Sequence, residues 1–191
     1  MSTGIKILSF FKEFFKDTKP RRNRVVPPLH TNFDLAGFFD GVAANGRGGC
    51  GFILYLNKEH FFRGWTGLKD STNNLAEVFA AWALLHWALL LKLTNLSIFG
   101  DSLFVINWLK GSSLIQAKNL VHHCSNIRIL IAQFEQVHFQ HVYRQHNMEA
   151  DCLSKKGLGS PKGILQIEEI ENGLVKIFST HRIFFLRLIE V

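Results

Sequence analysis

The sequence predicts a mixed α/β fold, in which one sheet of parallel and antiparallel strands has helices on both faces. Two observations carry this prediction. Three apolar, strand-like runs follow one another through short turns, and after them helix-periodic segments alternate with strand-like ones up to residue 158. Strands joined by short turns pair antiparallel, whereas strands joined through a helix pair parallel by a right-handed crossover.

The first half of the domain is predicted to be an antiparallel meander. We expect strands at residues 33–40, 51–56 and 60–65. The small residues at 43–49 (AANGRGG) predict one turn between them, and the polar residues at 57–59 predict the other. Trp65, near the end of the third strand, is a candidate for stacking on a base or sugar.

The second half alternates helices with strands. Residues 72–93 carry apolar side chains at helical spacing on nearly every face, which predicts a helix buried on more than one side. The further segments expected are strands at 96–100 and 137–144 and helices at 101–110, 116–134 and 147–156.

The 191 residues divide into a domain at 32–158 and two appendages. Residues 1–31 combine an amphipathic arm with a basic, Pro-containing linker, and residues 159–191 form a tail with a predicted hairpin around Asn172-Gly173. The net charge is +7, of which residues 1–30 carry +5 through seven basic and two acidic side chains. Such an arm suits a polyanion such as nucleic acid, and a solvated linker explains it equally well.

Cysteine usage and hydropathy indicate the compartment. The three cysteines, Cys50, Cys124 and Cys152, form no CxxC pair, which argues against a disulfide framework and against a zinc knuckle. We expect an intracellular, reducing location in the nucleus or cytoplasm, with an organelle as an alternative. The longest apolar run, residues 78–91, is too short to span a bilayer, so no membrane partner is expected.

Four carboxylates stand where predicted elements begin or end. Asp40 closes the first strand, Glu77 lies in the first turn of the long helix, Asp101 ends the fourth strand, and Asp151 lies in the first turn of the last helix. Carboxyl ends of parallel neighbouring strands share one rim of a sheet. Crowded carboxylates stay ionised only beside cations, and hard oxygen ligands suit Mg²⁺ or Mn²⁺. Two such ions would clamp a phosphate, so the pattern predicts metal-assisted phosphodiester hydrolysis.

Each acid also has a purely structural explanation. Asp40-Gly41 can be a plain turn, and Asn74 with Glu77 approximates a capping box. Asp101 can cap the next helix, and Asp151 can complement a helix dipole. All four in this strand-helix order favour a shared site.

Four segments resemble the ribonuclease H family. They are FFDG at 38–41, STNNLAE at 71–77, FGDSLFVINWLKG at 99–111 and FQHVYRQHNMEADCLSKKGL at 139–158. More narrowly, they resemble the reverse-transcriptase-like ribonuclease H domains of plant non-LTR retroelements and their host-encoded relatives. The resemblance implies a ribonuclease H-like five-stranded sheet of order 3-2-1-4-5, with strands 1, 4 and 5 parallel and strands 1 to 3 antiparallel.

The resemblance also implies an activity and residue roles. Asp40, Glu77, Asp101 and Asp151 would hold two Mg²⁺ or Mn²⁺ ions, and the reaction would be endonucleolytic hydrolysis of RNA in an RNA/DNA hybrid. His146 would shuttle a proton or assist product release, unless it is a solvent-facing loop histidine. Arg144 would approach a phosphate or the active-site acids, and Asn147 would help to position the strand or hold the start of the final helix. The residues expected to contact nucleic acid, either a hybrid or structured RNA, are Gly41, Asn73, Asn74, Ser102, Arg144 and Asn147.

Other functions stay open at this point. The segment AANGRGGCG at 43–51 departs from the family's usual Gly-Asn-Pro-Gly type of turn. A catalytically weak or inactive module of the same fold would bind nucleic acid or protein within a ribonucleoprotein assembly. The Phe-rich arm and the hairpin tail would dock a protein partner there, or the arm would pack on the domain itself. A structure-specific resolvase of the same superfamily is a third interpretation.

Overall fold

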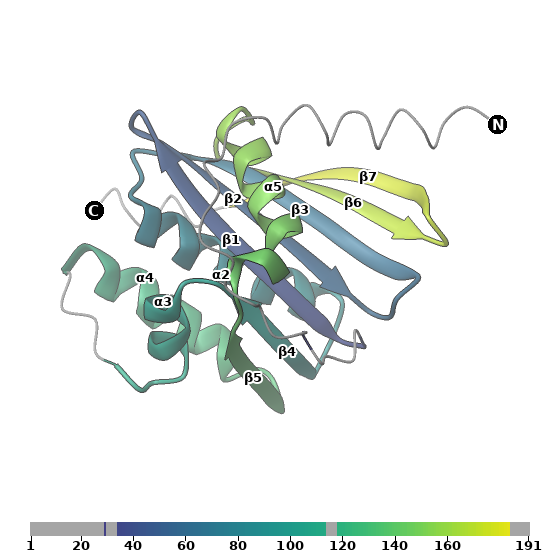
Figure 1. Cartoon of the computed structure of the whole chain (residues 1–191), viewed down its shortest axis with the longest axis horizontal. Coiled ribbons are helices and arrows are strands. Elements are labelled where there is room, and N and C mark those ends of the chain that lie inside the picture. The colour runs from purple at the N-terminus through teal and green to yellow at the C-terminus, as the bar shows by residue number, and fades with distance from the viewer. Residues whose placement is uncertain (1–28, 30–33, 114–117, 184–191) are drawn as a thin grey trace.

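The computed structural model of the chain describes residue 29 and residues 34–113 and 118–183. The amphipathic arm and nearly all of the basic linker lie outside these residues, as do the last eight residues of the tail. The described chain forms one seven-stranded sheet of order β5-β4-β1-β2-β3-β6-β7 (Figure 1).

The predicted core of the sheet is confirmed. β1 pairs antiparallel with β2 and β2 with β3, whereas β1, β4 and β5 run parallel. The sheet is wider than the five strands expected, because the β6–β7 hairpin pairs with β3 and extends the sheet beyond that edge. The strands are β1 (Ala36–Ala44), β2 (Arg47–Tyr55), β3 (His60–Lys69), β4 (Asn95–Gly100), β5 (Gln136–His141), β6 (Ile164–Glu171) and β7 (Leu174–Arg182).

The first turn differs from its prediction. β1 continues to Ala44, and only Asn45 and Gly46 form the turn, with φ of 51° and 72°. An Asn-Gly pair with two positive φ angles matches the twist of a tight hairpin. The prediction of a turn over residues 43–49 was wrong, because the later glycines of that segment belong to β2.

Helices cover both faces of the sheet. α2 packs on β1 and β2 behind the sheet and has α3 and α4 beside it, whereas α5 crosses β1, β2 and β3 in front (Figure 1). The helices are α2 (Asn73–Leu90), α3 (Leu103–Leu109), α4 (Lys118–Ile131), the short 3₁₀ helix η1 (Arg144–His146) and α5 (Met148–Leu158). None of the helices in the described part of the chain has the length and hydropathy needed to cross a bilayer.

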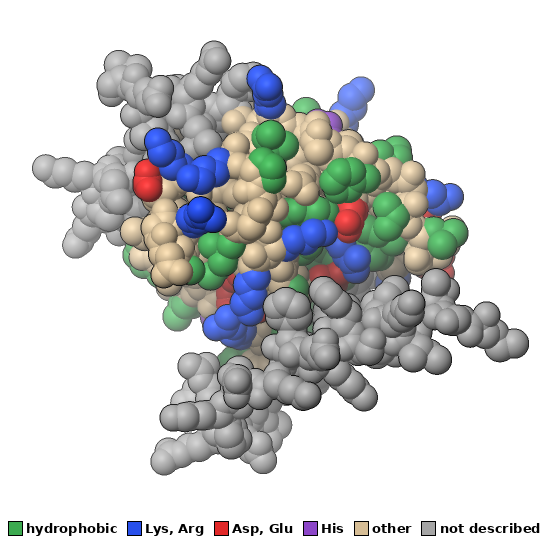
Figure 2. Space-filling model, turned by 90° about the horizontal axis from the view of Figure 1, so that it is seen from above, with side chains coloured by type: hydrophobic (Ala, Val, Ile, Leu, Met, Phe, Trp, Pro, Cys, Tyr) green, Lys and Arg blue, Asp and Glu red, His purple; other side chains and the backbone are tan. Residues whose placement is uncertain are grey.

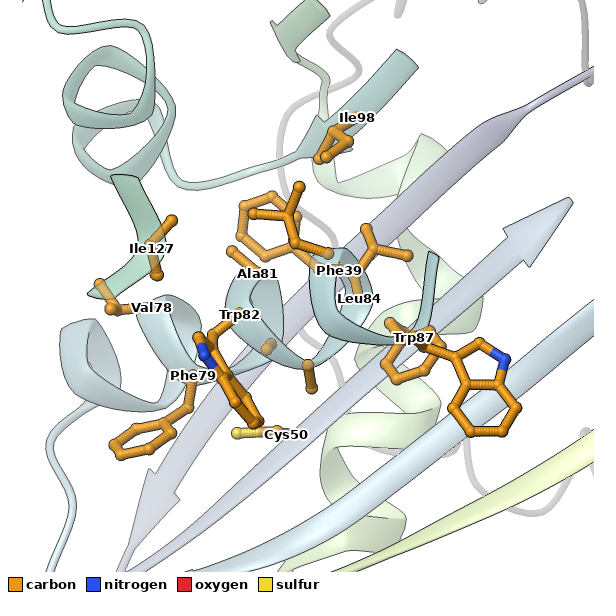
Figure 3. Close-up of a cluster of buried hydrophobic side chains, with 14 of the residues drawn as sticks. Phe39, Cys50, Val78, Phe79, Ala81, Trp82, Leu84, Trp87, Ile98 and Ile127 are labelled. Carbon is orange, nitrogen blue, oxygen red and sulfur yellow. The ribbon is translucent and has the colours of Figure 1, made fainter. Parts of the chain in front are cut away.

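Two apolar clusters lie on the two sides of the sheet. The larger one surrounds α2 and includes Phe39 from β1, Trp82 from α2 and Ile127 from α4 (Figure 3). The smaller one lies on the α5 side and includes Phe38 and Trp65. Trp65 is 2% exposed, so it is not available to stack on a base, contrary to the expectation.

Glycines in β2 allow α5 to lie directly on the strand. A Cβ at Gly49 would stand 2.1 Å from the Ser154 carbonyl oxygen, and one at Gly51 would stand 2.2 Å from the Ser154 amide nitrogen. Real Cβ atoms do not approach backbone this closely, so a larger residue would push α5 away. The glycine-rich segment therefore fixes the height of α5 above the sheet.

Candidate metal centre

Three carboxylates from three separate elements meet at one point. One oxygen each from Asp40, Glu77 and Asp101 lies within 4.8 Å of the other two. Asp40 lies inside β1, whereas the prediction placed it at the end of the strand. It follows the last β1–β4 pair, Phe38 with Phe99, so Asp101 leaves β4 next to it.

Glu77 reaches the group because β1 and α2 touch. It is the fifth residue of α2, so it lies in the second turn, not the first. The alternative explanation of Glu77 as part of a capping box with Asn74 does not hold, because the cap is Thr72, whose Oγ1 accepts a hydrogen bond from the Leu75 amide at 3.3 Å. A Cβ on Gly41 would stand 2.1 Å from the Ala76 carbonyl carbon and the Glu77 nitrogen. The missing side chain thus brings Glu77 against β1.

Burial makes these acids hold their protons strongly. Asp40 is 6% exposed and Glu77 is 9% exposed. Burial raises the pKa of Asp40 to about 7, aided by the charges of Asp101 and Asp151 and opposed by a hydrogen bond from Ser154. Burial, with the charges of Asp40 and Asp101, raises the pKa of Glu77 to about 9. A bound cation would oppose both shifts, because it favours the ionised form.

Two buried polar side chains orient the acids. Ser154 Oγ donates to Asp40 Oδ2 at 2.5 Å. Asn147 Nδ2 donates to the Phe39 carbonyl at 2.9 Å and to Asp101 Oδ1 at 3.3 Å. These two bonds link β1 to Asp101. Asn147 was expected to contact nucleic acid, but its side chain is buried, with 1% exposure.

The fourth predicted acid is placed differently. Asp151 lies in the first turn of α5, as predicted, but outside the group of three. Arg144 Nη2 lies 2.7 Å from its Oδ1, and Lys155 Nζ lies 2.5 Å from its Oδ2. Both of its oxygens are therefore engaged by cations, although its charge still acts on Asp40.

The residues expected to contact nucleic acid at the start of α2 are exposed. Asn73 Oδ1 accepts a hydrogen bond from the Ala43 amide at 2.7 Å, which ties the end of β1 to the helix. Asn74 follows it at the surface. Gly41, expected in the same set, is buried against α2.

Three other predicted residues flank the acids. Ser102 caps α3, with its Oγ 3.5 Å from the Val105 amide nitrogen. His146 ends η1 and is half-buried, directly before Asn147. The side chain of Arg144 is 62% exposed and reaches Asp151, so it stands where a phosphate and the acids could both be contacted.

Ser154 is the functional residue that sequence reasoning missed. It stands three residues after Asp151, so helical spacing places both on one face of α5. A small polar residue at that spacing from an expected metal ligand was the available signal. Lys155 follows Ser154 on the same helix and pairs with Asp151.

The donor set fits a hard divalent cation. Three carboxylates supply the oxygen ligands that such ions prefer. Glu77 Oε2 is buried and has no hydrogen-bond partner among the described residues. A buried acceptor without a partner is costly, and coordination to a cation would satisfy it. These residues are therefore suited to bind a divalent metal ion.

Comparison with known proteins gives a family match. The model of a family described as reverse transcriptase-like matches residues 38–157, which contain all four predicted acids. No curated protein sequence matches the chain significantly. The β6–β7 hairpin lies beyond the matched residues.

Solved structures show the same fold. RNase H1 from the halophilic archaeon Halobacterium salinarum NRC-1 matches with a TM-score of 0.61 and 26% identity, over 64% of this chain and 96% of that one. The N-terminal RNase H domain of rv2228c from Mycobacterium tuberculosis matches with a TM-score of 0.58 and 21% identity, over 65% of this chain and 94% of that one. LC11-RNase H1, solved in complex with an RNA/DNA hybrid, matches with a TM-score of 0.58 and 19% identity, over 64% of this chain and 95% of that one.

Proposed function

This chain belongs to the reverse transcriptase-like family, and we propose that it is a metal-dependent endonuclease that hydrolyses the RNA strand of RNA/DNA hybrids. The observation that carries the proposal is the meeting of Asp40, Glu77 and Asp101 within 4.8 Å, with a buried Glu77 oxygen that has no hydrogen-bond partner in the described part of the chain. The similarity to LC11-RNase H1, which was solved with an RNA/DNA hybrid, supports the choice of substrate.

In this proposal some residues bind the metal ions, and others keep the metal ligands oriented. Asp40, Glu77 and Asp101 would hold the first Mg²⁺ or Mn²⁺ ion, and Asp151 with Asp40 would hold a second. Bound there, such ions supply Lewis acidity at the phosphate and a water molecule of lowered pKa. Asn147 keeps Asp101 oriented through the hydrogen bond already described.

Side chains around the metal centre would contact the phosphates of the substrate. Arg144 and Lys155 would transfer their contacts from Asp151 to the phosphate backbone of a bound hybrid. Asn73 and Asn74 are exposed near the acids and would contact the sugar-phosphate backbone. On the face seen from above, Lys and Arg side chains are distributed among apolar ones (Figure 2). We therefore expect moderate affinity from the body of the domain, with recognition of hybrid shape through 2′-hydroxyls.

A cleavage assay tests the proposal directly. With millimolar Mg²⁺ or Mn²⁺, the protein should cut the labelled RNA strand of a hybrid and leave 3′-hydroxyl and 5′-phosphate ends. Asp101→Asn should abolish cleavage, because it removes a ligand charge while the amide can still accept from Asn147. Glu135→Gln, an exposed acid outside the site, is the matched control and should cut like the wild type. Absence of cleavage by the wild type with either metal would refute the proposal.

One observation favours a second candidate, a catalytically weak or inactive module that binds nucleic acid or protein in a ribonucleoprotein assembly. Asp151 is already neutralised by Arg144 and Lys155, so its oxygens are not open to a second ion in this arrangement. This candidate predicts hybrid binding with a steep salt dependence and no cutting. His146 would then be dispensable, whereas a nuclease that uses it for proton transfer or product release would slow when it is replaced.

A further inference from the structure

Part of the sheet face that carries α5 continues past the helix. α5 packs on β1, β2 and β3, and the β6–β7 hairpin extends to one side of it (Figure 1). Side chains directly opposite each other in antiparallel strands point to the same face. Two cross-strand rows on this face run from β2 to β7, namely Tyr55, Phe61, Ile170 and Val175, and Ile53, Arg63, Glu168 and Phe178.

We call the apolar part of this surface the hairpin face, which comprises Phe61, Trp65, Ile170, Val175 and Phe178. Its inner members are buried, with Trp65 at 2% and Ile170 at 4% exposure. Its outer members are open, with Val175 60% and Phe178 56% exposed. The Phe178 ring centroid lies 6.2 Å from that of Trp65, so the exposed ring continues a buried apolar layer. An apolar surface of this kind is suited to bind another apolar element.

Leu29, the described residue next to the N-terminal arm in sequence, lies beside this face. Leu29 packs against the apolar cluster on the α5 side, as do Tyr55 and Phe61, with which the first row begins. The row from Tyr55 to Val175 crosses three strand spacings, or roughly 14 Å. The 14 residues that separate Phe15 from Leu29 span up to about 46 Å when extended, so the arm reaches every part of the hairpin face.

The arm carries the matching chemistry. Its apolar residues recur at helical spacing, at Ile7, Leu8, Phe11, Phe14 and Phe15. We propose that this Phe-rich segment of the same chain binds the hairpin face and covers Val175 and Phe178. The arm is then an intrachain cover for the hairpin that extends the sheet beyond the family match.

The other apolar end of the chain is less suited to this face. Residues 184–191 follow Ile183, which packs in the cluster on the α2 side of the sheet. The amide of Ile183 donates to the Gly163 carbonyl at the end of the hairpin opposite its Asn172-Gly173 turn. Ile183, to which residues 184–191 are joined, therefore lies on the side of the sheet opposite the hairpin face, and at the end of β7 that is farther from the Asn172-Gly173 turn.

Photocrosslinking in the full-length chain tests the proposal. A p-benzoylphenylalanine in place of Phe178 should crosslink to peptides from residues 1–19, about tenfold more than one in place of Ile177. Ile177 is the matched control, because it is 54% exposed on the same strand and its partner in β6 is the adjacent Glu169, on the opposite face. The double substitution Phe11→Ser with Phe14→Ser should lower the Phe178 crosslink by at least about tenfold, as expected for lost aromatic burial.

Mixing isotopically labelled with unlabelled chains identifies the occupant. Crosslinked peptides of a single isotope support the proposal. Mixed-isotope peptides would show that a second copy covers the face, and peptides from residues 184–191 would show that the tail does; either result overturns it. So would equal crosslinking from Ile177, or none from Phe178. The same probe in place of Val175, also exposed, repeats the measurement should the Phe178 variant fold poorly.

Discussion

Replacing Glu77 with Gln should stabilise the metal-free protein at alkaline pH. Glu77 is buried beside Asp40 and Asp101, and one of its oxygens has no hydrogen-bond partner among the described residues. Ionising it there costs free energy, because burial removes the charge from water and the charges of Asp40 and Asp101 repel it. Gln has the same shape and stays neutral at every pH used.

The raised pKa of Glu77 sets the size and sign of the effect. A carboxyl whose folded pKa exceeds its unfolded value contributes stability that is fully present below the unfolded pKa and is lost as pH rises through the folded pKa. For Glu77 this window runs from 4.5 to about 9. Between about pH 5 and about pH 8, roughly three pH units at about 1.4 kcal/mol each give a loss near 4 kcal/mol. Asp40, whose pKa burial raises to about 7, adds a separate loss between about pH 5 and about pH 7, and replacing Glu77 does not remove it.

Chemical or thermal unfolding in a chelator measures this loss. Between about pH 5 and about pH 8, the wild type should lose about 4 kcal/mol more stability than Glu77→Gln, or about 10 °C more in Tm for a domain of this size. Glu77→Gln should keep only the smaller loss that comes from Asp40. Glu171→Gln, which changes a partly exposed acid whose Oε2 lies 3.4 Å from Lys176 Nζ, should lose as much as the wild type. Equal losses in the wild type and Glu77→Gln would refute the placement of a protonated acid at this point.

Three further outcomes are expected. Divalent metal should raise the Tm more at about pH 8 than at about pH 6, because binding must displace the protons held by the acids, and calorimetric proton release would check this. Gly41→Ala should cost about 3 kcal/mol of unfolding free energy, because its methyl group would meet the Ala76 backbone at 2.1 Å, whereas Gly159→Ala, whose Cβ would have only a contact at 3.9 Å, should be neutral. Lys155→Met should tighten Mn²⁺ binding about threefold in a titration, since it frees an oxygen of Asp151, and an unchanged affinity would show that the pair does not compete with the ion.

The strand directions and three members of the site could be predicted from local sequence, whereas the strand order was implied by the family resemblance. Short turns indicated antiparallel strands, and helical crossovers indicated parallel ones. In a parallel pair the register alone brings Asp101 next to Asp40, so a residue in β1 and one at the end of β4 suffice to locate the site. Glu77 needed one more element, the helix that follows the meander. The predicted bounds of β1 and α2 were wrong by a few residues, but the three acids still meet at one point beside the sheet.

The state of Asp151 could not be predicted in the same way. Its place on α5 follows from the helix, but its partners depend on side-chain directions. Lys155 lies four residues along the same helix, a spacing that permits a pair without requiring one. Arg144 comes from η1, a short 3₁₀ helix where the sequence predicted continued strand, and its approach depends on how the chain turns before Asn147. Composition and spacing contain too little information to decide such a contact.

The glycines of residues 43–51 show why a correct pattern can carry a wrong interpretation. Glycine serves a turn through its backbone freedom and a helix contact through its missing side chain, and the sequence does not separate these uses. Only Gly46 serves the turn here, whereas Gly49 and Gly51 let α5 settle on β2 at Ser154. That contact in turn sets the hydrogen bond from Ser154 to Asp40. The support of the first acid therefore depends on the packing of Gly49 and Gly51 against α5, so substitutions at Gly51 should disturb Asp40 before they disturb the turn.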